Sequence, residues 1–302
     1  MQRSSDTDRI LVITLSNIGD LILTTPVLEA LSARYPGALI DLVADRRSSS
    51  LLEAAPYVGQ IFHREKLAGW RAQWILLRSL RRRRYRLVVD LRTNIIPFLV
   101  RADQRLIKRA EKTAGLHAAE QHFAVLKPIL DAATPPPCRL HLDDNSRQRA
   151  RDLLAALPGD RWLALGPGAN WPGKRWPGGH SLELLRQVAS TFDGAIIVGT
   201  PDDVEAPLKL DELPLAVADL SGRTDLITAA AVISHACAFV GNDSGLGHIA
   251  AALDVPTLTL FGPGEPTRYR PWGSTAHVAL APGADLKQLT VEAVADALNG
   301  LL

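Results

Sequence analysis

The stretch from Phe239 to Pro271 constrains the fold more than any other part of the chain. It opens with the end of an apolar run, Ala236–Val240, which indicates a short buried strand. The next residues, Gly241–Gly245 (GNDSG), are types that tolerate unusual backbone angles and cap helices. A helix of small residues is expected over Leu246–Leu253, and a second strand over Thr257–Phe261. The stretch therefore predicts a strand, a glycine-rich turn, a helix and a strand.

The start of this helix favours a phosphate site. Free backbone N–H groups and the helix dipole attract anions there, and Ser244 and His248 flank the same position. Gly245 permits close approach of a ligand to the backbone. Asp243 is expected to organise the turn rather than to touch phosphate, because like charges repel. An ordinary βαβ unit with a capped helix is the alternative.

The same alternation of strands and helices runs through the rest of the chain. Strands are expected at 10–15, 38–43, 59–62, 87–91, 161–165, 195–198 and 216–219, and helices at 21–34, 51–57, 68–85, 101–112, 120–130, 145–157, 181–192, 226–235 and 290–302. This order is typical of mostly parallel sheets covered on both faces. We expect two Rossmann-like domains, 1–157 and 158–302, with the C-terminal helix free to pack back on the first. Ligands of such sheets bind beyond the carboxyl ends of the strands, here in an interdomain cleft.

Composition excludes several classes of protein. The 302 residues contain two cysteines, Cys138 and Cys237, which suggest neither a disulfide framework nor a zinc site and fit a reducing cytosol. No apolar run reaches eighteen residues, and the polar N-terminus lacks the apolar segment of a signal peptide. We expect a cytoplasmic protein.

Charge is divided unevenly between the two halves. Residues 1–150 carry 24 Lys and Arg against 15 Asp and Glu, and residues 151–302 carry 10 against 17, so the halves differ in sign, at +9 and −7. An excess of this kind favours a polyanionic partner for the first half, although a solvated basic face is the alternative. Its members include the run Arg81–Arg84, with Arg46, Arg47, Arg101, Arg105, Lys108 and Arg109.

Three motifs follow one another along the chain: Ser16–Asp20 (SNIGD) after the first strand, Gly168–Pro177 (GANWPGKRWP), and Gly241–Gly245 with His248; Phe261–Pro263 closes the set. In this order they resemble the motifs of glycosyltransferase family 9, the heptosyltransferases of lipopolysaccharide core assembly. The resemblance covers nearly the whole chain. It implies a GT-B fold and inverting transfer of a sugar from a nucleotide diphosphate, which in this family is ADP-heptose, without a metal or other cofactor. The implied acceptor is an anionic glycolipid at the cytoplasmic face of the inner membrane.

The resemblance also assigns roles to individual residues. Asp20 corresponds to the proposed general base, and Lys174 to the lysine on the donor phosphates, a point charge suited to that task. Capping of the following helix is the alternative for Asp20, and a solvated loop position is the alternative for Lys174. The other implied donor-binding residues are Gly168, Asn170, Asp203, Asp243, Ser244, Gly245 and His248. Asp203 stands where the family usually has Glu, so a helix cap is an equal alternative there. Arg46 and Arg92 are candidates for the acceptor.

Other classes fit less well. A dinucleotide oxidoreductase needs G-x-G-x-x-G at the first βα turn, and Asn17–Asp20 lacks those glycines. A nucleic-acid partner is not expected, because no stacking platform or helix-turn-helix pattern accompanies Arg81–Arg84. A transferase that uses another nucleotide sugar, and a non-catalytic sugar-nucleotide-binding relative, both stay open. The basic half predicts peripheral, salt-sensitive contact with anionic membrane.

Overall fold

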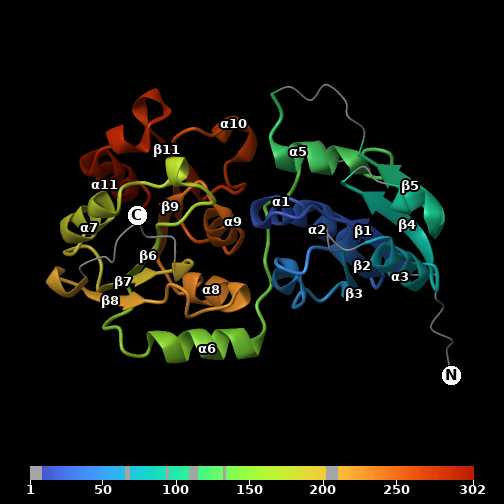
Figure 1. Ribbon diagram of the computed structural model, residues 1–302, viewed down its shortest axis with the longest axis horizontal. Coiled ribbons are helices and arrows are strands. Elements are labelled where there is room, and N and C mark those ends of the chain that lie inside the picture. Colours follow the sequence, from blue (N-terminus) through green and yellow to red (C-terminus); the bar gives the residue numbers. More distant parts are fainter. Residues whose placement is uncertain (1–8, 65–68, 93–94, 109–114, 132–133, 202–209) are drawn as a thin grey trace. The chain divides into compact units, whose positions relative to one another are not determined.

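The protein divides into two compact α/β units in a computed structural model, which describes residues 9–64, 69–92, 95–108, 115–131, 134–201 and 210–302. The units comprise Met1–His141 and Leu142–Leu302, and each is built around its own sheet (Figure 1). The expected boundary after Leu157 lies too far along the chain. Helix α6 (Asp144–Leu154) packs against α8 (Leu226–Ile233), so residues 142–157 belong to the second unit.

The first unit contains a parallel sheet of five strands in the order β3-β2-β1-β4-β5. The strands are β1 (Arg9–Ile13), β2 (Leu39–Ala44), β3 (Val58–His63), β4 (Arg84–Asp90) and β5 (Arg101–Ile107). The helices are α1 (Ile18–Ile22), α2 (Thr25–Arg34), α3 (Trp70–Leu80), α4 (Ile96–Leu99) and α5 (Ala118–Phe123), with 3-10 turns η1 (Ser49–Leu52) and η2 (Ala124–Leu126). The chain builds outward from β1 to β3 and then returns to β4. The strand order therefore reverses between β1 and β4, which is where ligands bind in open parallel sheets.

The second unit contains a six-stranded parallel sheet in the order β11-β10-β9-β6-β7-β8. Its strands are β6 (Trp162–Gly166), β7 (Gly194–Ile197), β8 (Ala216–Asp219), β9 (Ala238–Asn242), β10 (Thr257–Phe261) and β11 (Ala276–Leu280). Besides α6 and α8, its helices are α7 (Gly178–Gln187), α9 (Gly245–Ala252), α10 (Pro266–Tyr269) and α11 (Val291–Asn299), with short 3-10 turns η3 (Pro172–Lys174), η5 (Leu210–Glu212), η6 (Pro282–Ala284) and η7 (Leu286–Gln288). Here the order reverses between β6 and β9.

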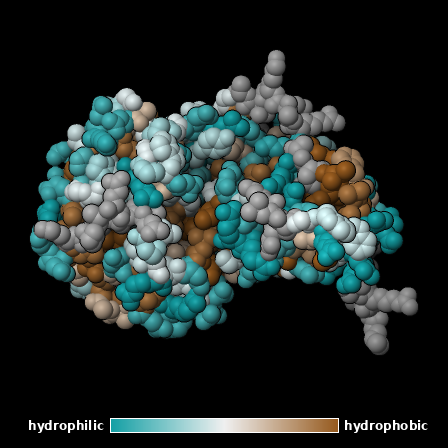
Figure 2. All heavy atoms as spheres, viewed as in Figure 1, coloured by the Kyte–Doolittle hydropathy of each residue, from teal (hydrophilic) through white to brown (hydrophobic). Residues whose placement is uncertain are grey.

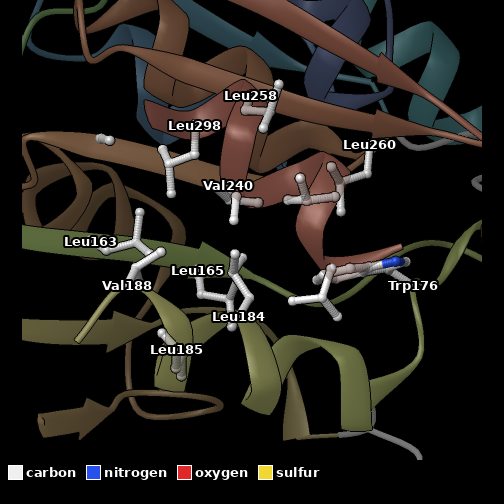
Figure 3. Packing of buried hydrophobic residues seen from close by; sticks show 14 of the residues in the cluster. Leu163, Leu165, Trp176, Leu184, Leu185, Val188, Val240, Leu258, Leu260 and Leu298 are labelled. Carbon is white, nitrogen blue, oxygen red and sulfur yellow. The ribbon is translucent and has the colours of Figure 1, made fainter. Parts of the chain in front are cut away.

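Helices α7 and α11 cover one face of the second sheet. Figure 3 shows alternate strand residues such as Leu163, Leu165 and Val240 meeting Leu184 of α7 and Leu298 of α11. Residues of the opposite parity point to the other face, where a side chain at Gly247 of α9 would lie 3.1 Å from the hydroxyl of Thr259. The C-terminal helix α11 thus packs on the core of its own unit.

Several expected elements differ from those observed. The helix expected over 51–57 is only a short 3-10 turn, η1, and the helix expected over 120–130 is the short helix α5 followed by η2. Residues 101–112, expected as a basic helix, contain the edge strand β5 instead. The helix expected over 68–85 ends at Leu80, because Arg84 and Tyr85 already pair with β5 as part of β4. The helix expected over 21–34 is two helices, α1 and α2.

Candidate functional site

The loops that follow β6 and β9 bring together Lys174 and Asp243 in the second unit. These strands are neighbours at the reversal point, and both loops leave from their carboxyl ends. The ammonium of Lys174 donates to a carboxylate oxygen of Asp243, and both side chains are partly shielded from solvent. The pair fixes a cation at the sheet edge where parallel sheets bind ligands.

Asn242, the last residue of β9, holds the loop after β6 in place. It is buried, its Oδ1 accepts the backbone N–H of Trp176 at 3.0 Å, and its Nδ2 donates to the carbonyl of Pro167 at 2.5 Å. The Trp176 ring lies within the core shown in Figure 3, and its Nε1 donates to the carbonyl of Leu289 at 2.9 Å. Lys174 therefore stands in a loop that is held at both ends.

Glycine allows β6 and β9 to end close together. Gly166 and Gly241 are paired in register, and a Cβ on Gly241 would lie 2.8 Å from the carbonyl oxygen of Gly166. The turn beyond β9 then leads directly into α9, whose first residue follows Ser244. The buried Oγ of Ser244 has no hydrogen-bond partner within the described part of the chain, and it makes no capping bond to α9. A hydroxyl and a helix start thus lie beside the Lys174–Asp243 pair.

The other predicted donor residues fall around this turn and its facing loop. Gly168 is buried and Asn170 is exposed in the loop after β6, while Gly245 begins α9 and His248 is buried in that helix. Asp203 lies outside the described residues. The donor-binding roles of all these residues stay predictions.

Asp20 occupies the corresponding position in the first unit, in α1 just beyond β1. Its Oδ2 accepts a hydrogen bond from the Asn17 side-chain amide at 3.0 Å. The residue at the helix cap is Asn17, and no side chain caps α1. Asp20 therefore does not cap this helix, which was the alternative role for it.

Arg92 follows β4 and reaches across to the β1 loop. Its Nη1 donates to Ser16 Oγ at 2.7 Å, and its backbone N–H donates to the buried carboxylate of Asp90 at 2.8 Å. Because β1 and β4 are neighbours, this contact joins the two loops at the reversal point of the first sheet.

Arg64 is a candidate that the sequence did not single out. It directly follows β3, and with Arg46 it lines a pocket of about 330 Å³ between the end of that strand and α3. Burial lowers the pKa of Arg64, and the charge of Arg92 lowers it further. Its buried Nε has no hydrogen-bond partner among the described residues. A basic residue within two positions of the end of the predicted strand 59–62 was the signal that could have identified it.

Two arginines of the basic run Arg81–Arg84 form ion pairs within the first unit. Arg83 donates to Asp41 Oδ2 at 2.6 Å, and Arg9 donates to Oδ1 of the same fully buried carboxylate at 2.8 Å. Arg84 pairs with Asp103 of β5. Only Arg81 and Arg82 are exposed members of the run for which no ion pair is seen within the described ranges.

The described residues contain no cluster of three or more His, Cys, Asp or Glu side chains placed to hold a metal ion. None of their helices combines the length and the apolar character needed to cross a bilayer.

Two parallel-sheet α/β units, each with polar residues gathered at its reversal point, agree with the GT-B fold of the solved glycosyltransferases that the chain resembles. The sequence model of glycosyltransferase family 9 (heptosyltransferase) matches residues 99–296, and the chain belongs to this family. The predicted family and fold class are thereby confirmed.

Known relatives agree with this assignment. Lipopolysaccharide heptosyltransferase 2 of Salmonella typhimurium is 30% identical, over 89% of this chain and 87% of its own length. The structure of E. coli ADP-heptose lps heptosyltransferase II is 27% identical and superimposes with a TM-score of 0.81, covering 97% of this chain and 98% of its own. E. coli heptosyltransferase WaaC with ADP shares the fold at 21% identity, with a TM-score of 0.80 and coverage of 97% and 100%.

Proposed function

We propose that this glycosyltransferase moves a heptose from ADP-heptose onto a lipopolysaccharide-core acceptor, with inversion at the anomeric carbon. The observation that carries the proposal is the Lys174–Asp243 pair at the reversal point of the second sheet, beside the start of α9. The similarity to an ADP-heptose transferase over almost the whole length supports the choice of donor.

The donor diphosphate is placed at the turn between β9 and α9. Backbone N–H groups at the start of α9 and the hydroxyl of Ser244 supply donors that suit phosphate oxygens. Lys174 supplies the cation that stabilises the departing diphosphate, whose charge grows in the transition state. Asp243 holds the ammonium in place and is expected to share it with the phosphate. No metal is required in this scheme, so activity should survive a chelator.

The acceptor hydroxyl is placed near Asp20, which takes its proton as general base. The carboxylate is fixed by one hydrogen bond from Asn17, and no capping bond to the backbone engages it. It therefore retains lone pairs for an acceptor hydroxyl.

Three arginines support an anionic acceptor. Arg46, Arg64 and Arg92 follow β2, β3 and β4, so all three lie at the carboxyl edge of the first sheet, as Asp20 does. Burial lowers the pKa of Arg64, and repulsion from the like charge of Arg92 lowers it further; a bound phosphate or carboxylate would relieve that repulsion. A glycolipid acceptor of this kind also implies work at the cytoplasmic face of the inner membrane.

Calorimetry with ADP, UDP and GDP, followed by transfer assays with ADP-heptose and defined core acceptors, tests the proposal. We expect selective binding of ADP and transfer to a heptose-accepting core. Preference for UDP or GDP would indicate another nucleotide sugar, and ADP binding without turnover on any core acceptor would indicate a non-catalytic relative.

A further inference from the structure

The outward side of α3 carries large hydrophobic side chains that nothing in the described structure covers. Trp70, Trp74 and Ile75 have exposed fractions of 76%, 56% and 65%. Leu76 and Leu80 of the same helix are buried in the core of the first unit. The helix therefore has a buried apolar side and, opposite it, a second apolar side that is exposed to solvent, which is unusual for large hydrophobic residues.

Arginines are interleaved with the exposed tryptophans. Residues 70, 74 and 78 follow one another at a spacing of four, so Trp70, Trp74 and Arg78 form a line along the helix, and Arg71 and Ile75 form a second line beside it. The guanidinium of Arg71 lies 5.6 Å from the Trp70 ring centre, and that of Arg78 lies 5.7 Å from the Trp74 ring centre. We call these five residues the outer face of α3.

A second exposed apolar group lies on the same side of the sheet. Ile96 and Val100, in and just after α4, enter the same buried cluster as Leu76 and Leu80, so the two helices cover one face of the sheet. Ile95 and Phe98 are about two-thirds exposed at 67% and 66%. In Figure 2, hydrophobic side chains gather on the surface of the first unit beside hydrophilic ones.

The charge around this surface selects an anionic partner. No acidic residue occurs between Glu65 and Asp90, whereas the segment contains seven arginines. A second copy of the same face would be repelled by this charge. Single-stranded nucleic acid would match arginine and tryptophan, but it leaves aliphatic side chains such as Ile75 and Ile95 without a partner. A bilayer surface matches both parts, because tryptophan rings lie at the level of the headgroups and arginines bind anionic lipid phosphates.

We propose that the outer face of α3 docks the protein on an anionic phospholipid bilayer, with Trp70, Trp74 and Ile75 entering the headgroup region and Arg71 and Arg78 contacting lipid phosphates. The proposed membrane contact is therefore α3 rather than the run Arg81–Arg84 that follows it, because Arg83 and Arg84 are engaged in ion pairs. Because side chains enter the interface, part of the binding should persist at high salt. The inference extends the proposed function by naming its membrane partner, and vesicle binding tests it without any turnover.

The experiment is co-sedimentation of the full-length protein with vesicles of phosphatidylglycerol and phosphatidylethanolamine, at low and at high salt, with phosphatidylcholine vesicles for comparison. A blue shift of tryptophan fluorescence on binding reports entry into the headgroup region. We expect the double variant Trp70→Ala/Trp74→Ala to bind on the order of tenfold more weakly and to lose the blue shift. Arg71→Gln/Arg78→Gln should weaken binding at low salt by about 30-fold, because each of the two arginines contributes about 1 kcal/mol near an anionic surface.

Matched variants in the second unit provide the controls. Leu280→Ala removes another exposed hydrophobic side chain, and Arg147→Gln/Arg151→Gln removes two exposed helical arginines. Both should bind vesicles as the unaltered protein does, and circular dichroism should show all variants folded. The proposal is overturned if the tryptophan variant binds vesicles normally, if the unaltered protein ignores anionic vesicles, or if it binds a single-stranded oligonucleotide tested in parallel but no vesicle. Nucleotide affinity should be the same in all these variants, so failure here is distinguishable from failure of the proposed transfer reaction.

Discussion

The side-chain oxygen of Asn242 accepts the backbone N–H of Trp176 at 3.0 Å, and so ties the turn after β9 to the loop after β6. The amide of the same side chain donates to the carbonyl of Pro167. One buried side chain thus fixes both ends of the loop that carries Lys174. The position of the Lys174 ammonium therefore depends on Asn242, a residue that need not touch the nucleotide sugar.

Replacing Asn242 should therefore affect stability and donor binding together. Asn242→Ala leaves the buried N–H of Trp176 and the carbonyl of Pro167 without partners, at a cost of about 1–3 kcal/mol for each group. We expect a lower free energy of unfolding in urea and a higher Kd for ADP. Asn170→Ala, in the exposed part of the same loop, should leave stability unchanged; equal stability of both variants would contradict the role of Asn242.

The Lys174–Asp243 pair predicts a non-additive response to mutation. Lys174→Ala should raise the Kd for ADP about 10- to 100-fold, because it removes a charge-assisted contact worth about 1.5–3 kcal/mol and leaves the Asp243 carboxylate facing the phosphates. Adding Asp243→Asn should recover part of this loss, since the repelling charge is then gone. Calorimetry on the four proteins of the cycle measures the coupling. Independent, additive effects would show that the lysine does not serve the phosphates.

Asp20→Asn should lower turnover and leave donor binding intact. A general base contributes about 10²–10⁴-fold to the rate, and the base contacts the acceptor rather than the nucleotide. We expect kcat to fall within that range at an unchanged Kd for ADP. Asn17→Ala, which removes only the hydrogen bond that orients the carboxylate, should have a smaller effect. Full activity of Asp20→Asn would remove this residue from the mechanism.

The basic run Arg81–Arg84 should divide into structural and exposed members. Arg83→Gln removes one of two arginine partners from the buried Asp41 carboxylate, which should destabilise the protein by about 2 kcal/mol. Arg81→Gln/Arg82→Gln changes two exposed side chains and should leave the free energy of unfolding within about 0.5 kcal/mol. Urea unfolding distinguishes the two variants, and an equal effect would contradict the assignment.

The buried thiol of Cys138 predicts a loss of stability in alkali. Burial raises the pKa of Cys138 from 9.0 to about 12. Between these values the unfolded chain loses the thiol proton while the folded protein keeps it, so stability falls as pH rises, by about 1.4 kcal/mol per pH unit. We expect the unaltered protein to lose about 2 kcal/mol more than Cys138→Ala between pH 9 and 10.5. Identical pH dependence of the two proteins would contradict this prediction.

The sequence predicted the parallel α/β order because the central strands are short apolar runs, such as Ile10–Ile13 and Leu163–Leu165, that are buried on both faces. It failed for β5, whose residues Arg101–Ile107 are mostly polar. Among the described residues that strand pairs with β4 alone, and an edge strand with exposed side chains lacks the apolar signal.

The candidate site was predictable where one motif supplies its parts. Asp243 and Ser244 were found because they lie in a single glycine-rich turn. The brace from Asn242 to Trp176 and the pairing of Arg83 with Asp41 join positions far apart in sequence, and no local pattern contains both partners. Arg64 was missed for the related reason that its lowered pKa arises from burial and from the charge of Arg92, which belongs to a different loop, and no local pattern reports either.

The adjacency of β6 and β9 also determines when the site around Lys174 can form during synthesis of the chain. A hydrogen bond such as that from Asn242 to Pro167 spans 75 residues, so a nascent chain must complete β7, β8 and α8 before the partner strand emerges. Closing so long a loop is entropically costly and makes this pairing a slow step of folding. A ribosome-bound chain that stops before β9 can therefore carry a folded first unit, but it lacks Asn242 and Asp243, the residues that hold the Lys174 loop and its ammonium in place.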